Sequence, residues 1–328
     1  MVVRGSNADS NSSKSSSNDS ANVKEVIELK LSYPNTETSL SGQSYNYFAK
    51  ALEEESNGSI KVTVYPAGSL VSNNEILDAI QQGNVDMGHF VVSYISPTIK
   101  ELTPLEIPGA SPSENYWDLD KATQDIVEKI FAKYDVKYLA PIEQGTGVFV
   151  SRTKLIKTPE DMKNFRVRAA GKWIGEAVKL WGGSPVTIPL GDLMTSLERG
   201  TVDAAFVTWT IAGPQKLYEA APYVAFTNLQ ESFGGLMMSK KSWDKLSEEQ
   251  KEAVSRAIDR FKEYSVNLAS EMKEKFIKDM EASGATVYHL TDDENALFRE
   301  PIKQLMEQSK QVSGSEGEEL IKALETIK

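Results

Sequence analysis

The sequence predicts an α/β fold with two similar lobes, a ligand cleft between them and one long helix that spans both. Residues 26–92 and 165–207 each follow the order strand, helix, strand, helix, strand. A helical pattern then runs from 247 to 283, which at about 1.5 Å per residue is longer than one lobe. Strands that alternate with helices form mostly parallel sheets, and such sheets bind ligands beyond the carboxyl ends of their strands.

A short internal repeat supports the two-lobe interpretation. Residues 79–86 match residues 196–203 at a constant offset of 117. In each copy a helix is followed by a glycine, Gly83 or Gly200, and then by a strand with an aspartate at its start. A glycine stops a helix at this position because it adopts the left-handed conformation without strain. We therefore expect the two lobes to share one topology.

Apolar periodicity places the individual elements. Strands are predicted where apolar and polar residues alternate, or where a short apolar run is bounded by turn residues. They fall at 26–31, 60–65, 85–92, 165–169, 185–188 and 202–207. Helices are predicted from one apolar face and from capping residues. They fall at 41–56, 75–82, 173–181, 192–199, 216–220, 242–246, 247–283 and 320–327, with one more after Thr291.

The chain divides into a leader and two lobes. Residues 1–25 are a Ser/Asn-rich leader or tether, expected to be disordered because it cannot bury enough apolar surface to offset its ordering entropy. Lobe 1 is assigned residues 26–144 and about 232–272, and lobe 2 residues 145–231 and about 273–328. No stretch of about 18 apolar residues is present, so no transmembrane helix is expected.

Composition excludes several classes of protein. The chain has 328 residues with 36 Lys and Arg against 47 Asp and Glu, and this net charge of −11 argues against nucleic acid as a partner. The absence of cysteine excludes disulfide scaffolds, thiol nucleophiles and thiolate metal sites, and two histidines are too few for a His-rich metal centre. No nucleophile elbow or phosphate-binding glycine loop appears, so no catalytic residues are assigned. His89 is interpreted as a structural histidine.

One arginine stands out as a candidate ligand contact. In the strand at 165–169, Phe165 and Val167 share one face, and Arg166 and Arg168 share the other. Arg168 lies where the strand meets the next helix, and a fixed guanidinium there can bind a carboxylate bidentately. The alternative is a solvent-facing arginine paired with a nearby acid.

Several segments carry a family resemblance through their order and spacing. They are FAKALE at 48–53, IKVTVYPAGSL at 60–70, residues 75–87, IKTPEDMKNFRVR at 156–168, residues 183–203 and MSKKSWDKLS at 238–247. Over residues 27–322 the chain resembles the solute-binding proteins of tripartite ATP-independent periplasmic (TRAP) transporters, the DctP-like family. The resemblance implies a type II periplasmic-binding-protein-like fold that closes on an organic acid. It also implies that Arg168 pairs with the ligand carboxylate.

Two departures from the family pattern concern the ligand. Many members that bind sialic acid or C4-dicarboxylates carry a second arginine where this chain has Gly147. The Gln-Glu-Asn element that usually follows Val-Asp is replaced by residues 204–209. We therefore expect a ligand with one strongly held anionic group, a small monocarboxylate such as a 2-oxo or 2-hydroxy acid, or an aromatic acid.

These departures are more similar to the branch that binds 2-oxo acids and lactate. In that branch a glutamine, an acidic residue and a tryptophan carbonyl hold a cation that bridges to the ligand carboxylate. By position, Gln144, Glu231 and Trp209 are the matching residues, and Na⁺ or Ca²⁺ prefers such oxygen ligands. The alternative is that Glu231 is a surface acid, Gln144 a hinge hydrogen bonder and Trp209 an apolar wall.

Aromatic side chains are expected to exclude water from the ligand. Trp209, Tyr94 and Phe233 are assigned to this role. Trp173, at the start of the helix after Arg168, is a further candidate, although large aromatics near helix starts are often core residues.

The resemblance implies an extracytoplasmic solute receptor that delivers its ligand to a TRAP membrane permease. It would be periplasmic or lipid-anchored on the outer face of the cytoplasmic membrane, and a monomer is favoured over a dimer. Two alternatives remain. One is an ABC-type or sensory ligand-binding domain for an organic acid, and the other is an enzyme on a two-lobed α/β scaffold, because fold does not fix function.

Overall fold

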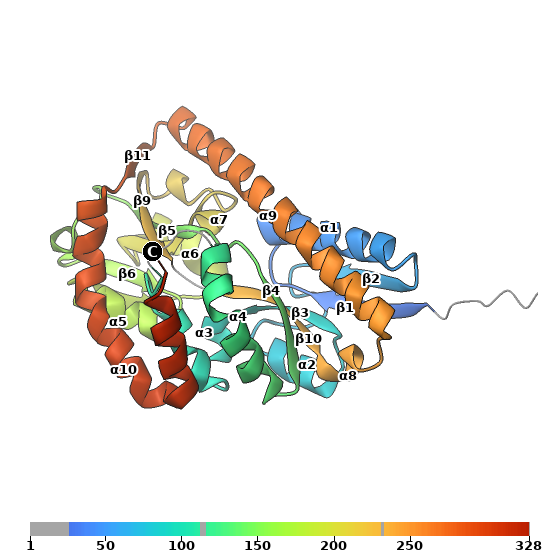
Figure 1. The fold of residues 1–328 in the computed structure, drawn as a ribbon. Helices are drawn as coiled ribbons and strands as arrows, with labels where there is room; N and C mark the ends of the chain where they lie inside the picture. The colour runs from blue at the N-terminus through green and yellow to red at the C-terminus, as the bar shows by residue number, and fades with distance from the viewer. Residues whose placement is uncertain (1–25, 112–115, 231–232, 328) are drawn as a thin grey trace, which may run out of the picture.

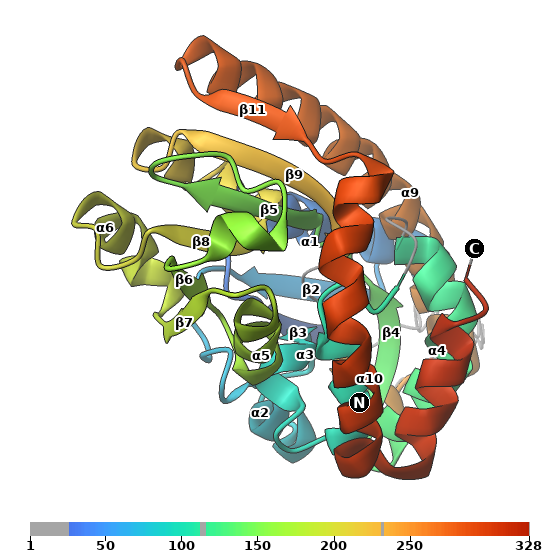
Figure 2. The same cartoon turned by 90° about the vertical axis from the view of Figure 1, so that its left-hand side faces the viewer.

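The computed structural model of the protein describes residues 26–111, 116–230 and 233–327. The predicted leader at 1–25 and the candidate Glu231 lie outside the described residues. The described chain forms two β-sheets with helices on both faces of each (Figures 1 and 2). No described helix is long and apolar enough to cross a membrane.

Lobe 1 is built on a five-stranded sheet in the order β2-β1-β3-β10-β4. Its strands are β1 (Ile27–Ser32), β2 (Ile60–Tyr65), β3 (Met87–Val91), β4 (Val136–Pro141) and β10 (Gly234–Ser239). β1 is parallel to β2 and β3, whereas β10 runs antiparallel between β3 and β4. One face packs against α1 (Leu40–Glu55), and the other against α2 (Ile76–Gln82), α3 (Val92–Ile95), η1 (Lys100–Glu106) and α4 (Tyr116–Ala132).

Lobe 2 is built on a six-stranded sheet in the order β11-β9-β5-β8-β6-β7. Its strands are β5 (Thr146–Ser151), β6 (Arg166–Ala169), β7 (Ser184–Thr187), β8 (Ala204–Thr208), β9 (Tyr223–Gln230) and β11 (Thr286–His289). One face packs against α5 (Lys172–Leu180) and the other against α6 (Leu193–Glu198) and α7 (Trp209–Ala212). Short helical turns complete the chain: η2 (Pro159–Met162), η3 (Leu190–Asp192), η4 (Leu217–Glu219) and α8 (Lys240–Trp243).

The long helix α9 (Glu248–Ala282) belongs to both lobes, as predicted. It begins at Ser247, whose side chain accepts the N–H of Gln250 in a capping box. Its first half packs Phe261 into the core beside α1, and its second half packs Phe276 into the core of lobe 2. Figure 1 shows the helix running from α8 at one end of the molecule to β11 at the other.

The last helix, α10 (Asp292–Leu324), also contacts both lobes. Gly314 breaks its helical geometry with φ 64° and ψ −160°, so the helix consists of two arms. The first arm packs Phe298 into lobe 2, while the second arm packs Leu320 and Leu324 into the core of lobe 1, beside α4 (Figure 2). Residues 273–328 were assigned to lobe 2 alone, and the second arm departs from that assignment because the kink turns its apolar face toward η1 and α4.

The internal repeat corresponds to a repeated local structure. Gly83 and Gly200 both adopt left-handed backbone angles, with φ of 76° and 71°, where α2 and α6 end. Strands β4, β5, β9, β10 and β11 and the helix α4 are not predicted by the local sequence patterns. The central strands β5 and β10 are buried at every position and therefore carry no alternation to reveal them.

Candidate functional site

A cleft of about 470 Å³ lies between the two sheets. Its lining comes from the segments that follow the carboxyl ends of β1, β3, β6 and β8, where an α/β sheet offers a ligand site. The lining residues are Pro34, Asn35, Thr36, Ser39, Leu40, Ser41, Asn73, His89, Val91, Ser93, Tyr94, Glu143, Gln144, Arg168, Ala170, Leu190, Gly191, Thr208, Thr210, Ile211, Pro214 and Gln215. Three predicted site residues are thus brought together here: Arg168, Gln144 and Tyr94.

Arg168 is the one cationic side chain among the described residues that line the cleft. It lies near the end of β6, is 4% exposed, and its Nε donates to the carbonyl oxygen of Ile188 at 3.2 Å. A guanidinium carries five N–H donors in one plane, so this bond fixes the plane of the group. The burial of Arg168 and its place on the cleft are what a carboxylate contact requires.

The alternative of a solvent-facing, acid-paired arginine describes Arg166 instead. Arg166 lies at the exposed start of β6, and its guanidinium pairs with Asp203 at 2.8 Å. Its Nη2 also donates to the carbonyl oxygen of Gly200 at 2.7 Å. Arg166 and Arg168 share one face of the strand, so their positions along β6 separate them: Arg166 lies at the exposed first residue, and Arg168 lies two residues later in the buried part that reaches the cleft.

Gln144 and its neighbour Glu143 form the part of the cleft where the chain crosses from β4 to β5. The carboxylate of Glu143 accepts the N–H of Gly145 at 2.8 Å, which folds the segment back on itself. The hydroxyl of Thr210 donates to the carbonyl oxygen of Gln144 at 2.6 Å. The first contact holds the Glu143 side chain and the second holds the backbone of Gln144, and both residues line the cleft.

The lobe 1 wall is mostly uncharged and polar. Tyr94, predicted at a strand end, lies in α3 because β3 already stops at Val91, and it is 40% exposed on the cleft. Hydroxyl and amide side chains line the rest of this wall: Asn35, Thr36, Ser39, Ser41, Asn73 and Ser93. Such groups donate to and accept from neutral oxygens of a ligand.

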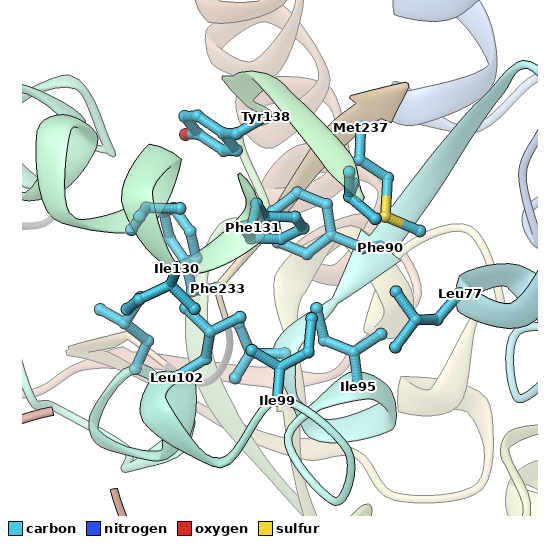
Figure 3. Close-up of a cluster of buried hydrophobic side chains, with 14 of the residues drawn as sticks. Leu77, Phe90, Ile95, Ile99, Leu102, Ile130, Phe131, Tyr138, Phe233 and Met237 are labelled. Carbon is cyan, nitrogen blue, oxygen red and sulfur yellow. The ribbon is translucent and has the colours of Figure 1, made fainter. Parts of the chain in front are cut away.

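Three predicted wall residues lie in apolar cores and not among the cleft-lining residues. Phe233 is 0% exposed and packs against Phe90 in lobe 1, as Figure 3 shows. Trp173 is 6% exposed in the core beside α5, and Trp209 is 3% exposed in the core of lobe 2. Large aromatic side chains gain most by full burial, and the helix starts at 172 and 209 turn these two inward.

His89, which the sequence predicts to be a structural histidine, also borders the cleft. It lines the cleft, is 1% exposed, and its Nδ1 lies 2.6 Å from the hydroxyl oxygen of Tyr45. Burial lowers the pKa of His89 to about 4, so the imidazole is neutral near pH 7. The available signal was its position near the end of a buried parallel strand, which equally fits a structural histidine.

A buried carboxylate occupies the start of the helix that follows Arg168. Glu106 of η1 accepts the backbone N–H of Trp173 on α5 and the hydroxyl of Ser96 at 2.6 Å. Burial raises the pKa of Glu106 above its ordinary value. A helix start attracts anions, and here the carboxyl group of Glu106 occupies that place.

Gly147 shows why a second arginine is absent. A Cβ atom at this position would lie 2.2 Å from Cζ of Phe206 on the neighbouring strand β8. No side chain fits there without displacing that ring. The cleft therefore lacks a second guanidinium at this position for a packing reason.

The sequence profile of DctP, the bacterial extracellular solute-binding protein, family 7, matches residues 31–311. The chain belongs to this family. The ectoine-binding periplasmic protein TeaA of Halomonas elongata is 25% identical over 292 residues, 85% of this chain and 85% of that protein. The 2,3-diketo-L-gulonate-binding periplasmic protein YiaO of Escherichia coli is 22% identical over 303 residues, 91% of this chain and 92% of that protein.

Solved structures confirm the fold. A TRAP periplasmic solute-binding protein from Ochrobactrum anthropi superimposes with a TM-score of 0.85 at 23% identity, over 93% of this chain and 96% of that chain. The resemblance to TRAP solute-binding proteins is therefore confirmed, and the two-lobed α/β architecture with it. As a family 7 protein, the chain is an extracytoplasmic solute receptor of the TRAP type and not an enzyme.

Proposed function

We propose that this family 7 receptor binds a small monocarboxylic acid that carries hydroxyl or keto groups, and that Arg168 holds its carboxylate. The observation that carries the proposal is the buried guanidinium on the cleft, oriented by the carbonyl oxygen of Ile188. A planar guanidinium binds a carboxylate through two parallel N–H···O bonds, which are stronger than neutral hydrogen bonds. Closure of the lobes over the acid follows from tighter binding in the closed state.

A single carboxylate is favoured over two. Arg168 is the one cationic group among the described lining residues, so a second carboxylate would have no guanidinium of its own there. Two curated relatives are named for ectoine and for 2,3-diketo-L-gulonate, each a compound with one carboxylate, and two others, 24% and 26% identical, are named for C4-dicarboxylates. The diketogulonate also carries keto and hydroxyl groups, for which the amides and hydroxyls on the lobe 1 wall are suitable partners.

A bridging cation is a second element of the proposal. Gln144 lines the cleft, and an amide oxygen suits Na⁺ or Ca²⁺. The carbonyl oxygen of Trp209 accepts the N–H of Gly213 at 3.0 Å within α7, and a carbonyl has a second lone pair to offer. Titration with the acid in sodium-free buffer, then with sodium, with calcium and with chelator, decides this point. Equal affinities in all four buffers contradict the cation.

The bound acid is handed to a TRAP membrane permease. We propose a receptor that is periplasmic or lipid-anchored on the outer face of the cytoplasmic membrane. We propose that it is a monomer, because the two lobes of one chain form the whole cleft. Sedimentation of the purified receptor with and without acid tests the monomer. A dimer in either state contradicts it.

The direct test is a thermal-shift screen of organic acids followed by calorimetry. Pyruvate, L-lactate, glycolate and 2,3-diketo-L-gulonate are the candidates, and succinate is the dicarboxylate comparison. An acid at about 100 times its Kd stabilises the protein by about 2.7 kcal/mol. We expect stronger shifts with monocarboxylates than with succinate.

The arginine is tested by substitution with the best acid of the screen. Arg168→Ala is expected to weaken binding at least about 30-fold, since truncating one partner of a buried charged pair costs about 2 to 5 kcal/mol. Arg168→Lys retains the charge but loses the bidentate geometry, so it is expected to recover only part of the affinity. Arg199→Ala is the control, because Arg199 is an exposed arginine of the same lobe. Unchanged affinity in Arg168→Ala contradicts the proposal.

A further inference from the structure

A buried histidine and tyrosine border the cleft on the lobe 1 side. His89 of β3 lines the cleft, and its Nδ1 lies 2.6 Å from the hydroxyl oxygen of Tyr45 on α1. Aromatic contacts fix the tyrosine, because Phe261 stacks on it at 5.8 Å and Tyr33 lies at 5.5 Å. The imidazole is therefore held by the core of lobe 1 along its Nδ1 edge.

The distances decide which way the hydrogen bond runs. The Tyr45 hydroxyl has one hydrogen and two acceptors within reach, Nδ1 of His89 at 2.6 Å and the carbonyl oxygen of Gly235 at 3.5 Å. The first distance is that of a strong bond, and the second lies at the outer limit. Burial raises the pKa of Tyr45 well above 10.0 and lowers that of His89, so both groups are neutral. When Nδ1 of a neutral imidazole accepts, Nε2 carries the hydrogen.

Among the described residues, no hydrogen bond reaches Nε2 of His89. We infer that the Nε2–H of His89 donates to an uncharged hydroxyl or keto oxygen of the bound acid, and that this contact selects acids that carry such an oxygen. The inference rests on the proposed function and assigns a second contact to the same ligand. A carboxylate prefers the charged Arg168, whereas a neutral oxygen in a dry site is well served by a neutral donor.

The two donors lie on different lobes. His89 belongs to the lobe 1 sheet and Arg168 to the lobe 2 sheet, and both line the same cleft. An acid that reaches both groups connects the lobes through its carboxylate at one end and its hydroxyl or keto oxygen at the other. Acids without the neutral oxygen lose the lobe 1 contact, so they are weaker at drawing the lobes together.

The tautomer is measured directly by NMR of the imidazole nitrogens. The chain contains two histidines, His89 and His289, so a ¹⁵N-labelled sample shows two imidazole spin systems, and His289→Gln assigns them. We expect His89 to be neutral at pH 7 with the hydrogen on Nε2. We also expect its Nε2 signal to shift when L-lactate is added. A hydrogen on Nδ1, or an Nε2 signal that saturating L-lactate does not move, overturns the inference.

Selectivity is measured with two pairs of acids that differ by one hydroxyl, L-lactate against propionate and glycolate against acetate. His89→Leu is expected to weaken the two hydroxy acids about tenfold and to leave their partners unchanged. His89→Gln places an amide N–H near the position of Nε2 and is expected to restore most of the preference. Tyr45→Phe removes the hydroxyl that keeps the hydrogen of His89 on Nε2. This variant is therefore expected to reduce the preference for hydroxy acids. His289→Gln is the control.

The outcomes separate this inference from the proposed function. Equal losses for both members of a pair, or no loss, in a folded His89→Leu overturn the inference and leave the Arg168 contact standing. Unchanged L-lactate affinity in Arg168→Ala overturns the proposed function. If the wild-type protein binds none of these four acids and neither pyruvate nor 2,3-diketo-L-gulonate, both fall.

Discussion

Asp203 and Arg166 join two neighbouring strands through backbone and side chain together. The N–H of Asp203 donates to the carbonyl oxygen of Arg166 at 2.8 Å, and the Asp203 carboxylate accepts the N–H of Arg166 at 2.9 Å. The same carboxylate pairs with the Arg166 guanidinium at 2.8 Å. These contacts fix the first residue of β6, the strand that carries Arg168 to the cleft.

Lobe 1 contains the same arrangement without the guanidinium. The N–H of Asp86 donates to the carbonyl oxygen of Lys30 at 3.2 Å, and the Asp86 carboxylate accepts the N–H of Lys30 at 2.8 Å. The sequence match at an offset of 117 therefore reflects a shared way of joining a strand to its neighbour. Each lobe uses it to set the strand whose carboxyl end leads to the cleft.

Replacement of the aspartate tests its contribution to stability. The Arg166 guanidinium holds the pKa of Asp203 below its ordinary value of 3.8. The contribution is therefore present above pH 3.8 and is lost as the pH falls through the lower pKa of the folded state. We expect Asp203→Asn to reduce the free energy of unfolding by about 1 to 2 kcal/mol near pH 7, with a smaller difference from wild type below pH 3.8. Urea unfolding at a series of pH values measures the loss of unfolding free energy and its pH dependence. Asp259→Asn is the control, because Asp259 is exposed. A constant difference across this range contradicts the assignment.

The buried histidine predicts a second rise of stability with pH. Here the cause is the burial of a neutral imidazole, whereas at Asp203 it is the pairing of a charged carboxylate. Burial lowers the pKa of His89 from 6.5 to about 4, so between these values the unfolded chain binds a proton that the folded chain does not. Stability therefore rises with pH through this window, by an amount on the order of 3 kcal/mol. The charged groups that line the same cleft are Glu143 and Arg168, and the hydrogen-bond partner of His89 is Tyr45.

The measurement compares wild type with His89→Gln between pH 4 and 6.5. We expect the variant to lose less stability than wild type as the pH falls, because its side chain does not titrate. His289→Gln should follow the wild-type curve. Parallel curves for wild type and His89→Gln would show that His89 titrates normally.

Local sequence patterns predict the strands in which apolar and polar residues alternate and the helices that carry capping residues. The other strands depend on contacts between residues that are far apart in the sequence. The capping box at Ser247 and the glycine stops at Gly83 and Gly200 are local, so they were found. Strand β10 was not, because its neighbours β3 and β4 lie far away in the sequence and all its residues are buried. The cleft shows the same division: the place of Arg168 on a strand made it a candidate that the family resemblance then favoured, whereas the pairing of His89 with Tyr45 joins residues 44 positions apart.

Glu106 provides a test of the contact between η1 and α5. Burial raises its pKa above 4.5, although Ser96 and the N–H of Trp173 favour the charged form. The folded state therefore keeps this proton to higher pH than the unfolded state, so stability falls as the pH rises above 4.5 through the folded pKa. We expect Glu106→Gln to gain stability relative to wild type over that rise. Differential scanning calorimetry at pH 4.5 and pH 8 measures the change, and a variant that loses stability relative to wild type on this rise contradicts the assignment.

The packing around Gly147 limits how far the cleft can be altered to bind dicarboxylates. A Cβ there would lie 2.2 Å from Cζ of Phe206, so Gly147→Ala is expected to cost about 1 to 3 kcal/mol of unfolding free energy. Gly191→Ala is the matched control, since nothing lies within 4 Å of its added Cβ. Combining Gly147→Ala with Phe206→Leu should cost less than the sum of the two single changes, because the smaller side chain removes the overlap. Additive losses would show that Phe206 is not the obstacle. If the overlap is confirmed, Gly147→Arg alone is expected to destabilise the fold without raising the affinity for succinate, because the arginine lacks room beside β8.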